Sequence, residues 1–425
     1  MLIKNGRILD PANGTDTISD ILIKGERIAL IGRGLEADDS EEEVIDAGSF
    51  IVAPGLVDVH AHYRDPGQTK KEDLHTGALA AAAGGYTSVL CMANTVPAVD
   101  SIPVLEDILK RASEEKIHIY QSGAVTMGRE GRKLVPMEEL LGAGAVGFTD
   151  DGTPITDKEL VGSAMTEAKR LGVPLSFHEE DPRYVTEAGI NAGKTAAAMG
   201  LTGADRMAEK VMIERDLTMA IETGAVVDIQ HVSSREGVEL IRRFRKKDPR
   251  GLIHAEACPH HFSLTEEWIV RKGTLAKVNP PLRTEEDRLA IIEGIKDGTI
   301  DLIATDHAPH TMDEKSREFV KAPSGMIGQQ TALALGITNL VEKGHIPMSR
   351  LIELMSLNPA RLYGFEAGSL AVGNKADIVI FDPKRKWEFK ESDILSRSHN
   401  SPFIGMTFTG RVIYTIADGK VVYRL

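Results

Sequence analysis

The chain contains very little cysteine. Its 425 residues include only Cys91 and Cys258, and two cysteines are too few for a disulfide framework. Each one ends an apolar, strand-like run, which is typical of a buried free thiol. Free thiols persist in a reducing compartment, so we expect a cytoplasmic protein.

Excess basic charge and long apolar runs are also missing. The formal net charge is −13, whereas proteins that bind nucleic acid present a basic face. The same charge disfavours docking on an anionic membrane. The first residues, "MLIKNGRILD", lack the apolar core of a signal peptide. The longest apolar stretch, residues 77–93, is interrupted by Gly84 and Gly85 and is too short to cross a bilayer. We therefore expect neither a nucleic-acid partner nor a membrane contact.

Apolar residues, in contrast, are plentiful. They make up 42% of the sequence and charged residues 27%. A chain of this length and composition can form one large barrel-type domain or two to three ordinary domains.

The two ends of the chain share one pattern, in which short alternating strands are separated by turn signals. Residues 1–50 contain turn signals at Asn5-Gly6 and Gly25-Glu26, and residues 365–425 contain one at Asp418-Gly419. Neither end has enough strands to bury a core alone. We therefore predict that both ends combine into one small β-sandwich.

Residues 51–364 show a different pattern, in which short apolar runs alternate with helical stretches such as 157–171 and 205–223. There are eight apolar runs: 57–60, 87–91, 117–121, 146–149, 174–178, 226–231, 253–258 and 302–305. Eight strands with intervening helices over about 300 residues predict a TIM-type β/α barrel. A doubly wound open sheet is the alternative, but no glycine-rich fingerprint follows the first run.

Metal-binding residue types stand at the ends of five of these runs. The first run ends in His60-Ala61-His62, and residues i and i+2 of a strand point to the same side. The other four ends carry Asp150-Asp151, His178, His231 and Asp306. Because the carboxyl ends of barrel strands meet at one mouth, these side chains should converge there. The sequence therefore predicts a metal-dependent site.

Two metal ions fit this supply of ligands better than one, because a single zinc uses only three or four protein ligands. A pair of cations needs a bridging anion, and the fourth strand offers Asp150 or Asp151 for that role. Two metals that share a water generate hydroxide at neutral pH, which suits hydrolysis or condensation of amides, esters or phosphates.

Other histidines are set aside because their local sequence offers no metal-type neighbour. These are His75, His118, His254, His345 and His399. His260 and His261 follow the seventh strand near the predicted mouth, where they could support the site indirectly.

Seven motifs together resemble the dihydroorotases of the amidohydrolase superfamily, in their long bacterial and archaeal form. The motifs are "VDVHAHYRDPG", "TDDG", "HEED", "HVSS", "CPHHF", "NPPLR" and "ATDHAPH". The terminal segments also look like the composite β-sandwich of that superfamily, so the resemblance covers essentially the whole chain.

The resemblance implies a zinc pair and assigns its ligands. His60, His62 and Asp306 would hold one zinc, and His178 and His231 the other. Asp151 would bridge them, as in the branch that uses aspartate where relatives use a carboxylated lysine, with Asp150 as the alternative. The implied substrate contacts are His62, Arg64, Asn94, Asn279, His310 and backbone groups at Ser324 and Gly325. Relatives often carry Phe-Gly at the last position, so Ser324 departs from the family pattern.

The implied reaction is the reversible cyclisation of N-carbamoyl-L-aspartate to (S)-dihydroorotate in pyrimidine biosynthesis. A zinc-bridging hydroxide would attack the ring amide, with Asp306 as general acid and base. Arg64 suits this substrate because a guanidinium binds carboxylate bidentately. The competing interpretation of Arg64 is a surface ion pair with Asp65.

Two other functions stay open. A dihydropyrimidinase, hydantoinase or allantoinase would share the barrel and metals, but such enzymes usually supply lysine on the fourth strand. A catalytically silent barrel that scaffolds aspartate transcarbamoylase is the second alternative, although a silent copy tends to lose ligands. We also expect a homo-oligomer, with a complex with aspartate transcarbamoylase as a further expectation.

Overall fold

The computed structural model describes residues 1–37 and 43–425. Within this part of the chain, eight short strands form a parallel barrel. They are β6 (Leu56–Ala61), β7 (Tyr86–Cys91), β8 (His118–Gln121), β9 (Phe148–Thr149), β10 (Leu175–Phe177), β11 (Val227–Ile229), β12 (Ile253–Ala257) and β13 (Leu302–Ile303). They coincide with the eight predicted runs, so the TIM-type barrel is confirmed.

Two ladders and two single bridges hold the barrel together. One ladder runs β6-β7-β8 and the other β13-β12-β11-β10-β9. Parallel bridges between Gly123 and Phe148, and between Ala61 and His307, connect the ladders at both junctions. Because all strands run parallel, their carboxyl ends open at the same mouth.

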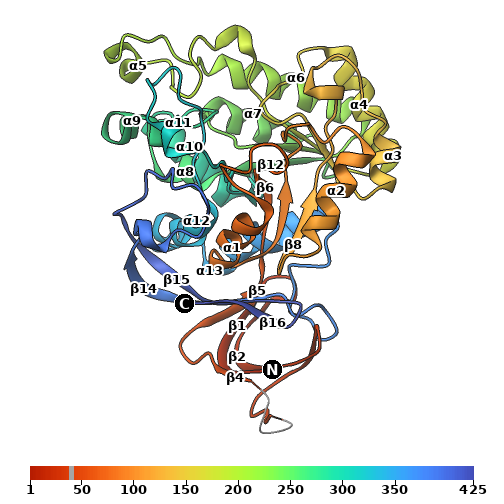
Figure 1. The fold of residues 1–425 in the computed structure, drawn as a ribbon, viewed down its shortest axis with the longest axis vertical. Helices are drawn as coiled ribbons and strands as arrows, with labels where there is room; N and C mark the ends of the chain where they lie inside the picture. The colour runs from red at the N-terminus through yellow and green to blue at the C-terminus, as the bar shows by residue number, and fades with distance from the viewer. Residues whose placement is uncertain (38–42) are drawn as a thin grey trace.

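Helices surround the barrel (Figure 1). The longer ones are α1 (Leu74–Ala83), α2 (Ile102–Ala112), α4 (Lys158–Leu171), α6 (Met207–Thr223), α7 (Arg235–Arg245), α10 (Glu285–Asp297) and α12 (Gln329–Gly336). The shorter ones are α3 (Met137–Gly142), α5 (Lys194–Ala198), α8 (Pro259–Ser263), α9 (Glu267–Lys272), α11 (Met312–Lys315), α13 (Met348–Ile352) and α14 (Asn358–Tyr363). Within the described part of the chain, no helix combines the length and the apolar character needed to span a membrane.

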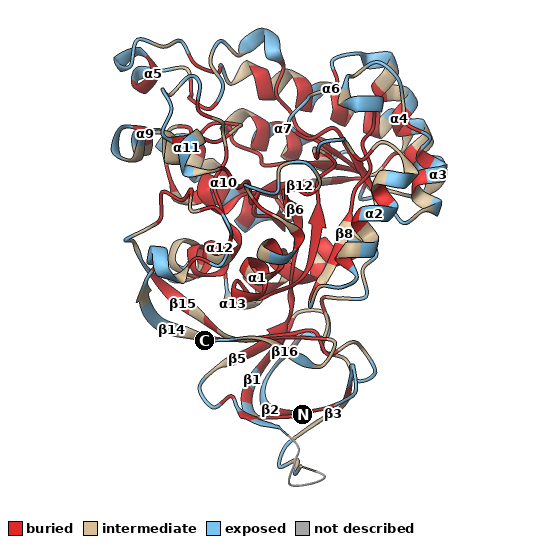
Figure 2. Ribbon diagram, viewed as in Figure 1, coloured by how far each residue is buried: buried red, intermediate tan, exposed pale blue. Residues whose placement is uncertain are grey.

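Local sequence explains where the long helices begin and end. Asp157 caps α4 by accepting hydrogen bonds from the backbone of Glu159 and Leu160, and Gly172 ends that helix in the left-handed conformation. Buried residues lie along the barrel strands and on the inner sides of the helices (Figure 2). The predicted helices at 157–171 and 205–223 are therefore confirmed within two residues.

The two ends of the chain form one mixed sheet below the barrel. Its order is β16-β15-β14-β5-β1-β2-β3, with β4 paired to β1. The strands are β1 (Leu2–Asp10), β2 (Thr15–Lys24), β3 (Arg27–Gly32), β4 (Val44–Asp46), β5 (Ile51–Pro54), β14 (Ile378–Glu388), β15 (Thr407–Ala417) and β16 (Lys420–Arg424). Ile8, Ile21, Val52, Ile378 and Ile416 belong to its separate apolar core. Strands from both termini therefore share one core, as predicted.

The predicted boundary at residue 51 falls just before β5, which belongs to this sheet rather than to the barrel. The division into domains at 1–50, 51–364 and 365–425 stays a prediction.

One of the predicted turns is wrong. Asn5-Gly6 lies inside β1, where the pairing with β2 shifts register between Ile3 and Gly6. Asn5 has a φ of 62° and donates its backbone N–H to Asp20, which produces a bulge instead of a reversal. A Cβ on Gly6 would lie 2.4 Å from Val52, so glycine is needed here for packing against β5. The turns at Gly25-Glu26 and Asp418-Gly419 do join consecutive strands.

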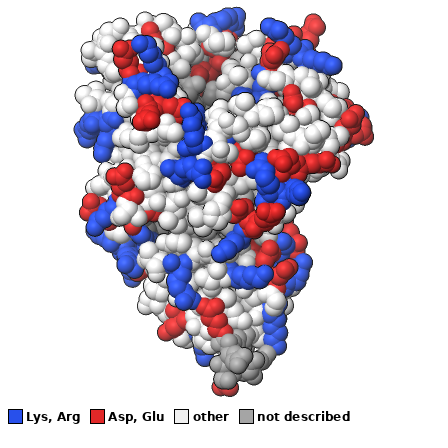
Figure 3. Space-filling view, viewed as in Figure 1, with Lys and Arg blue, Asp and Glu red and all other residues white. Residues whose placement is uncertain are grey.

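Charged side chains of both signs are interspersed over the face seen in Figure 3. This face therefore shows no continuous basic surface of the kind that nucleic acids bind.

Candidate metal centre

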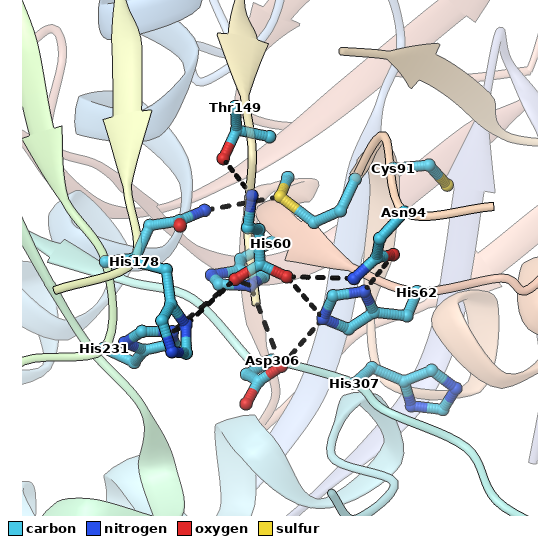
Figure 4. Close-up of polar contacts among 12 residues, drawn as sticks. His60, His62, Cys91, Asn94, Thr149, His178, His231, Asp306 and His307 are labelled. Atoms are coloured by element: carbon cyan, nitrogen blue, oxygen red, sulfur yellow. Dashed lines mark hydrogen bonds and ion pairs between the residues drawn. The ribbon is translucent and has the colours of Figure 1, made fainter. Parts of the chain in front are cut away.

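Residues from five strand ends meet at the barrel mouth. Figure 4 shows His60, His62, His178, His231 and Asp306 directed toward a common centre. All of these residues, together with Asp151, are at least 94% buried. The rings of His60 and His62 lie 5.3 Å apart, and those of His178 and His231 lie 4.6 Å apart. The structure therefore brings together every predicted metal ligand.

Asp151 lies between the two pairs of histidines. One potential ligand group contains His60, His62 and Asp151, and another contains Asp151, His178 and His231. Its Oδ1 is 3.6 Å from His60 Nε2 and 3.3 Å from His178 Nδ1. Its Oδ2 is 3.5 Å from His62 Nε2. One carboxylate thus faces both groups, which is the position that a bridging ligand requires.

Asp150 points elsewhere. Its Oδ1 accepts hydrogen bonds from the backbone N–H of Val125 at 2.8 Å and of Thr126 at 3.1 Å, and its Oδ2 accepts from the Thr126 hydroxyl. The side chain therefore stabilises the loop after β8. This geometry favours Asp151 over Asp150 as the bridging residue.

Asp306 completes the group around His60 and His62. Its Oδ1 lies 3.0 Å from His62 Nε2 and 3.7 Å from His60 Nε2. Asp306 has a φ of 47°, and His231 has a φ of 35°. Non-glycine residues rarely adopt this left-handed conformation, and when they do the strain is often found at functional sites.

The cluster strongly shifts the pKa values of its members. Burial acts to raise the pKa of Asp151, but His60, His178 and His231 hold it well below its usual range. Burial acts to lower the pKa of His178, but Asp151 and Glu180 raise it to about 9. Burial acts to raise the pKa of Asp306 as well, yet the imidazoles around it lower that pKa. Asp151 and Asp306 are therefore ionised at neutral pH.

These residues fit a divalent cation. Among the described residues, His60 Nε2 is buried and has no hydrogen-bond partner. A buried ring nitrogen without a partner costs free energy, which a metal ion in the centre would offset. Imidazole and carboxylate are ligands that zinc and similar divalent ions take.

A residue that we did not predict, Glu256 on β12, orients His60. Its Oε2 lies 2.9 Å from His60 Nδ1, and both side chains are fully buried. A carboxylate on Nδ1 fixes the tautomer in which the Nε2 lone pair faces the centre. Glu256 lies inside an apolar run, "IHAEACPHH", and a charged residue in a buried strand was the available signal.

We expect Glu256→Leu to weaken metal binding by roughly 10–100-fold, the usual cost of removing such an outer partner. Glu256→Gln keeps an acceptor for the His60 N–H and should lose less affinity. Competition with a chelator measures the metal affinity of each variant. Glu293→Gln is the control, because Glu293 is exposed and pairs with Lys296. Equal metal affinity in Glu256→Leu and the wild type would show that His60 needs no such partner.

The predicted substrate contacts lie beside the metal-type residues. Asn94 accepts from His62 Nδ1 at 2.9 Å and donates to Asp151 at 3.1 Å. Arg64 Nη2 lies 3.4 Å from His310 Nε2. Asp65 pairs with Arg111 at 2.7 Å, so the alternative Arg64–Asp65 ion pair is not formed.

Asn279, Ser324 and Gly325 lie next to residues that contact the metal-type cluster or Arg64. Asn279 donates to Glu180, whose carboxylate is also 3.6 Å from His178 Nε2. His310 Nε2 is 2.9 Å from the carbonyl oxygen of Ser324. Glu180 belongs to the "HEED" motif but was not among the predicted site residues.

Most of the histidines set aside have ordinary partners. His75, His254 and His399 pair with Glu115, Asp301 and Glu391. His118 differs, because Asp377 and Asp418 lie 3.0 and 3.6 Å from its Nε2 although they are distant in sequence. His260 is almost fully buried, and its Nε2 has no hydrogen-bond partner within the described residues.

Comparisons with known proteins identify the family of this chain and proteins that resemble it. The model of the amidohydrolase family matches residues 51–422. A dihydroorotase of Clostridioides difficile (strain 630) is 52% identical over 423 residues, which cover 100% of this chain and 99% of that protein. A dihydroorotase of Lactococcus lactis subsp. lactis (strain IL1403) is 48% identical over 424 residues, with the same coverage. Among solved structures, the L-hydantoinase (dihydropyrimidinase) of Arthrobacter aurescens has a TM-score of 0.89 at 28% identity and covers 100% of this chain and 96% of that one.

Proposed function

Because this chain belongs to the amidohydrolase family, we propose that it is a dihydroorotase, which interconverts N-carbamoyl-L-aspartate and (S)-dihydroorotate in pyrimidine biosynthesis. The main support for this function is a sequence identity of about 50%, over the full length of the chain, to proteins named dihydroorotase. The similarity to a hydantoinase is weaker, at 28% identity. Residue 151 is also aspartate, whereas hydantoinase-type enzymes usually supply lysine.

We propose that the centre holds two zinc ions. His60, His62 and Asp306 would bind one ion, His178 and His231 the other, and Asp151 would bridge them. The two ligand groups that share Asp151 support this arrangement. When bound, the metal pair would lower the pKa of a water molecule and polarise the ring amide carbonyl.

The chain's own residues then bind the substrate and move a proton. In the hydrolytic direction the oxygen of water adds to the ring amide carbon, and the bond from that carbon to the ring nitrogen breaks. Asp306, ionised and directed into the centre, accepts the proton of the attacking water and gives it to the departing nitrogen. In biosynthesis the same steps run backwards with loss of water.

Arg64, Asn94 and His310 would hold the substrate carboxylate that does not react. Arg64 Nε and Nη2 have only long contacts, at 3.4 Å, with Pro309 O and His310. Its guanidinium therefore keeps donors available for a carboxylate, which it can bind bidentately. Asn279 and the backbone at Ser324 and Gly325 would contact the pyrimidine ring.

Arg64→Lys keeps the charge but loses the planar fork. We expect the KM for dihydroorotate to rise roughly 30- to 150-fold, because a bidentate charge-assisted contact is worth about 2–3 kcal/mol. Steady-state kinetics measure this, with Arg183→Lys as a control because Arg183 is exposed and pairs with the nearby Asp181. An unchanged KM in Arg64→Lys, combined with rapid hydantoin hydrolysis, would favour a hydantoinase.

We also propose that the enzyme is a cytoplasmic homo-oligomer. A complex with aspartate transcarbamoylase stays a prediction, which co-elution of the two purified proteins in size-exclusion chromatography tests. The complete ligand set argues against a catalytically silent scaffold.

A further inference from the structure

Two buried lysines lie next to the segment that borders the mouth. Lys277 follows the short helix η3 (Gly273–Ala276), and Lys315 is the last residue of α11. Their exposed fractions are 3% and 2%. Among residues 1–37 and 43–425, no carboxylate forms an ion pair with either ammonium group, and the hydrogen bonds that they donate all go to carbonyl oxygens. Burying an ammonium group without a counter-charge costs free energy of folding, which the hydrogen bonds to carbonyl oxygens must offset.

Both ammonium groups bind the mouth segment, which we define as residues 319–325. Lys277 Nζ donates to the carbonyl oxygens of Phe319 and Ala322, both at 2.7 Å, and lies 4.9 Å from the centre of the Phe319 ring. Lys315 Nζ donates to the carbonyl oxygens of Gly325 at 2.9 Å and Pro323 at 3.0 Å. The two Nζ groups therefore bind carbonyl oxygens along the segment, from Phe319 at its start to Gly325 at its end.

The carboxyl end of the segment is fixed against the site. Gly325 donates its backbone N–H to the carbonyl oxygen of Lys277 at 2.8 Å. Gly325 has a φ of 133°, and a Cβ there would lie 2.7 Å from the Cβ of Ala308. The carbonyl of Ser324 contacts His310, which in turn lies beside Arg64. Movement of this segment would therefore displace residues at the mouth.

Burial disfavours the charged form of both lysines. Burial, together with the nearby charge of Lys277, lowers the pKa of Lys315 to about 7. Burial also lowers the pKa of Lys277. An apolar side chain at either position would avoid this cost but could not bind the carbonyls.

We infer that Lys277 and Lys315 are positioning residues, which hold the mouth segment as a preformed wall against which the cyclic substrate binds. The identity of the substrate in this inference rests on the proposed function, whereas the fixed position of the segment does not depend on it. A wall that is already in place spares the substrate the entropy of ordering it, so the lysines act on KM more than on kcat.

The test uses Lys315→Met, which keeps an unbranched side chain but has no donor, in the full-length, metal-loaded enzyme. The matched control is Lys296→Met, because Lys296 is exposed on α10, outside this segment, and pairs with Glu293. Two readouts are compared: the rate of trypsin cleavage after Arg317, at the exposed start of this loop, and the KM and kcat for dihydroorotate. Lys315→Gln keeps donors on a shorter stem and should give partial rescue.

We expect Lys315→Met to be cleaved after Arg317 roughly tenfold faster and to show a KM roughly tenfold higher, with kcat within about threefold of the wild type. Lys296→Met should match the wild type in both readouts. Wild-type cleavage in Lys315→Met, or faster cleavage with an unchanged KM, would overturn the inference. If Lys315→Met does not fold, the same two readouts on Lys315→Gln decide. If the wild type does not turn over dihydroorotate, the proposed function is contradicted. The cleavage rates would still test whether Lys315 holds the mouth segment in place.

Discussion

Asp306→Asn should lower turnover by roughly two to four orders of magnitude, the usual contribution of general acid–base catalysis. Asparagine keeps the size of the side chain and an oxygen that can serve as a ligand, but it cannot take up a proton at neutral pH. Asp306 lies 3.0 Å from His62 and faces the centre. Asp151 is the other carboxylate that lies near both His60 and His62, and it is assigned the bridging position, so Asp306 is the carboxylate left for the proton transfer.

The measurement is kcat for dihydroorotate together with the metal content of the same sample. Asp313→Asn serves as the control, because Asp313 is exposed in the first turn of α11. Metal content should be largely retained in Asp306→Asn. Near-normal turnover with the metal bound would remove Asp306 from the proton transfer.

Asp151→Ala and Asp150→Ala should have different effects although the two residues are adjacent. Asp151 faces both groups of histidines, so its removal should cost the protein at least one metal ion. Turnover should fall by more than the roughly 10–100-fold that follows the loss of an outer partner. Asp150 instead binds the backbone of Val125 and Thr126. Its removal should cost about 1–3 kcal/mol in the free energy of unfolding, because buried donors lose their acceptor.

Metal analysis, turnover and thermal unfolding of the two variants separate these effects. Each variant serves as the control for the other. A loss of metal in Asp150→Ala with full retention in Asp151→Ala would reverse the assignment of the bridging residue.

The barrel could be predicted because each strand is short, apolar and followed by a break in the pattern. The same pattern located the site, since the strand ends of a parallel barrel share one mouth. His60 and His62 are two residues apart, and their rings do face one centre. The choice between Asp150 and Asp151 could not be made from spacing, because it depends on which carboxylate the loop after β8 binds.

The sequence was less informative where a polar residue is buried. Lysine is usually exposed, so nothing in the local pattern indicated that Lys277 and Lys315 lie inside the protein. Glu256 is similar, because its partner His60 is 196 residues away. Asn5-Gly6 is a strong turn signal, yet pairing on both sides of it keeps β1 continuous. In each case tertiary contacts, which local sequence does not encode, decide the outcome.

The most direct test of the central claim is a side-by-side assay of purified protein with dihydroorotate, hydantoin and allantoin, with metal analysis of the same sample. We expect rapid interconversion of dihydroorotate and N-carbamoyl-L-aspartate, little turnover of the other two compounds, and more than one zinc per chain. Chelation should abolish the activity, and added zinc should restore it. Hydrolysis of hydantoin or allantoin without turnover of dihydroorotate, or full activity in a metal-free sample, would contradict a metal-dependent dihydroorotase.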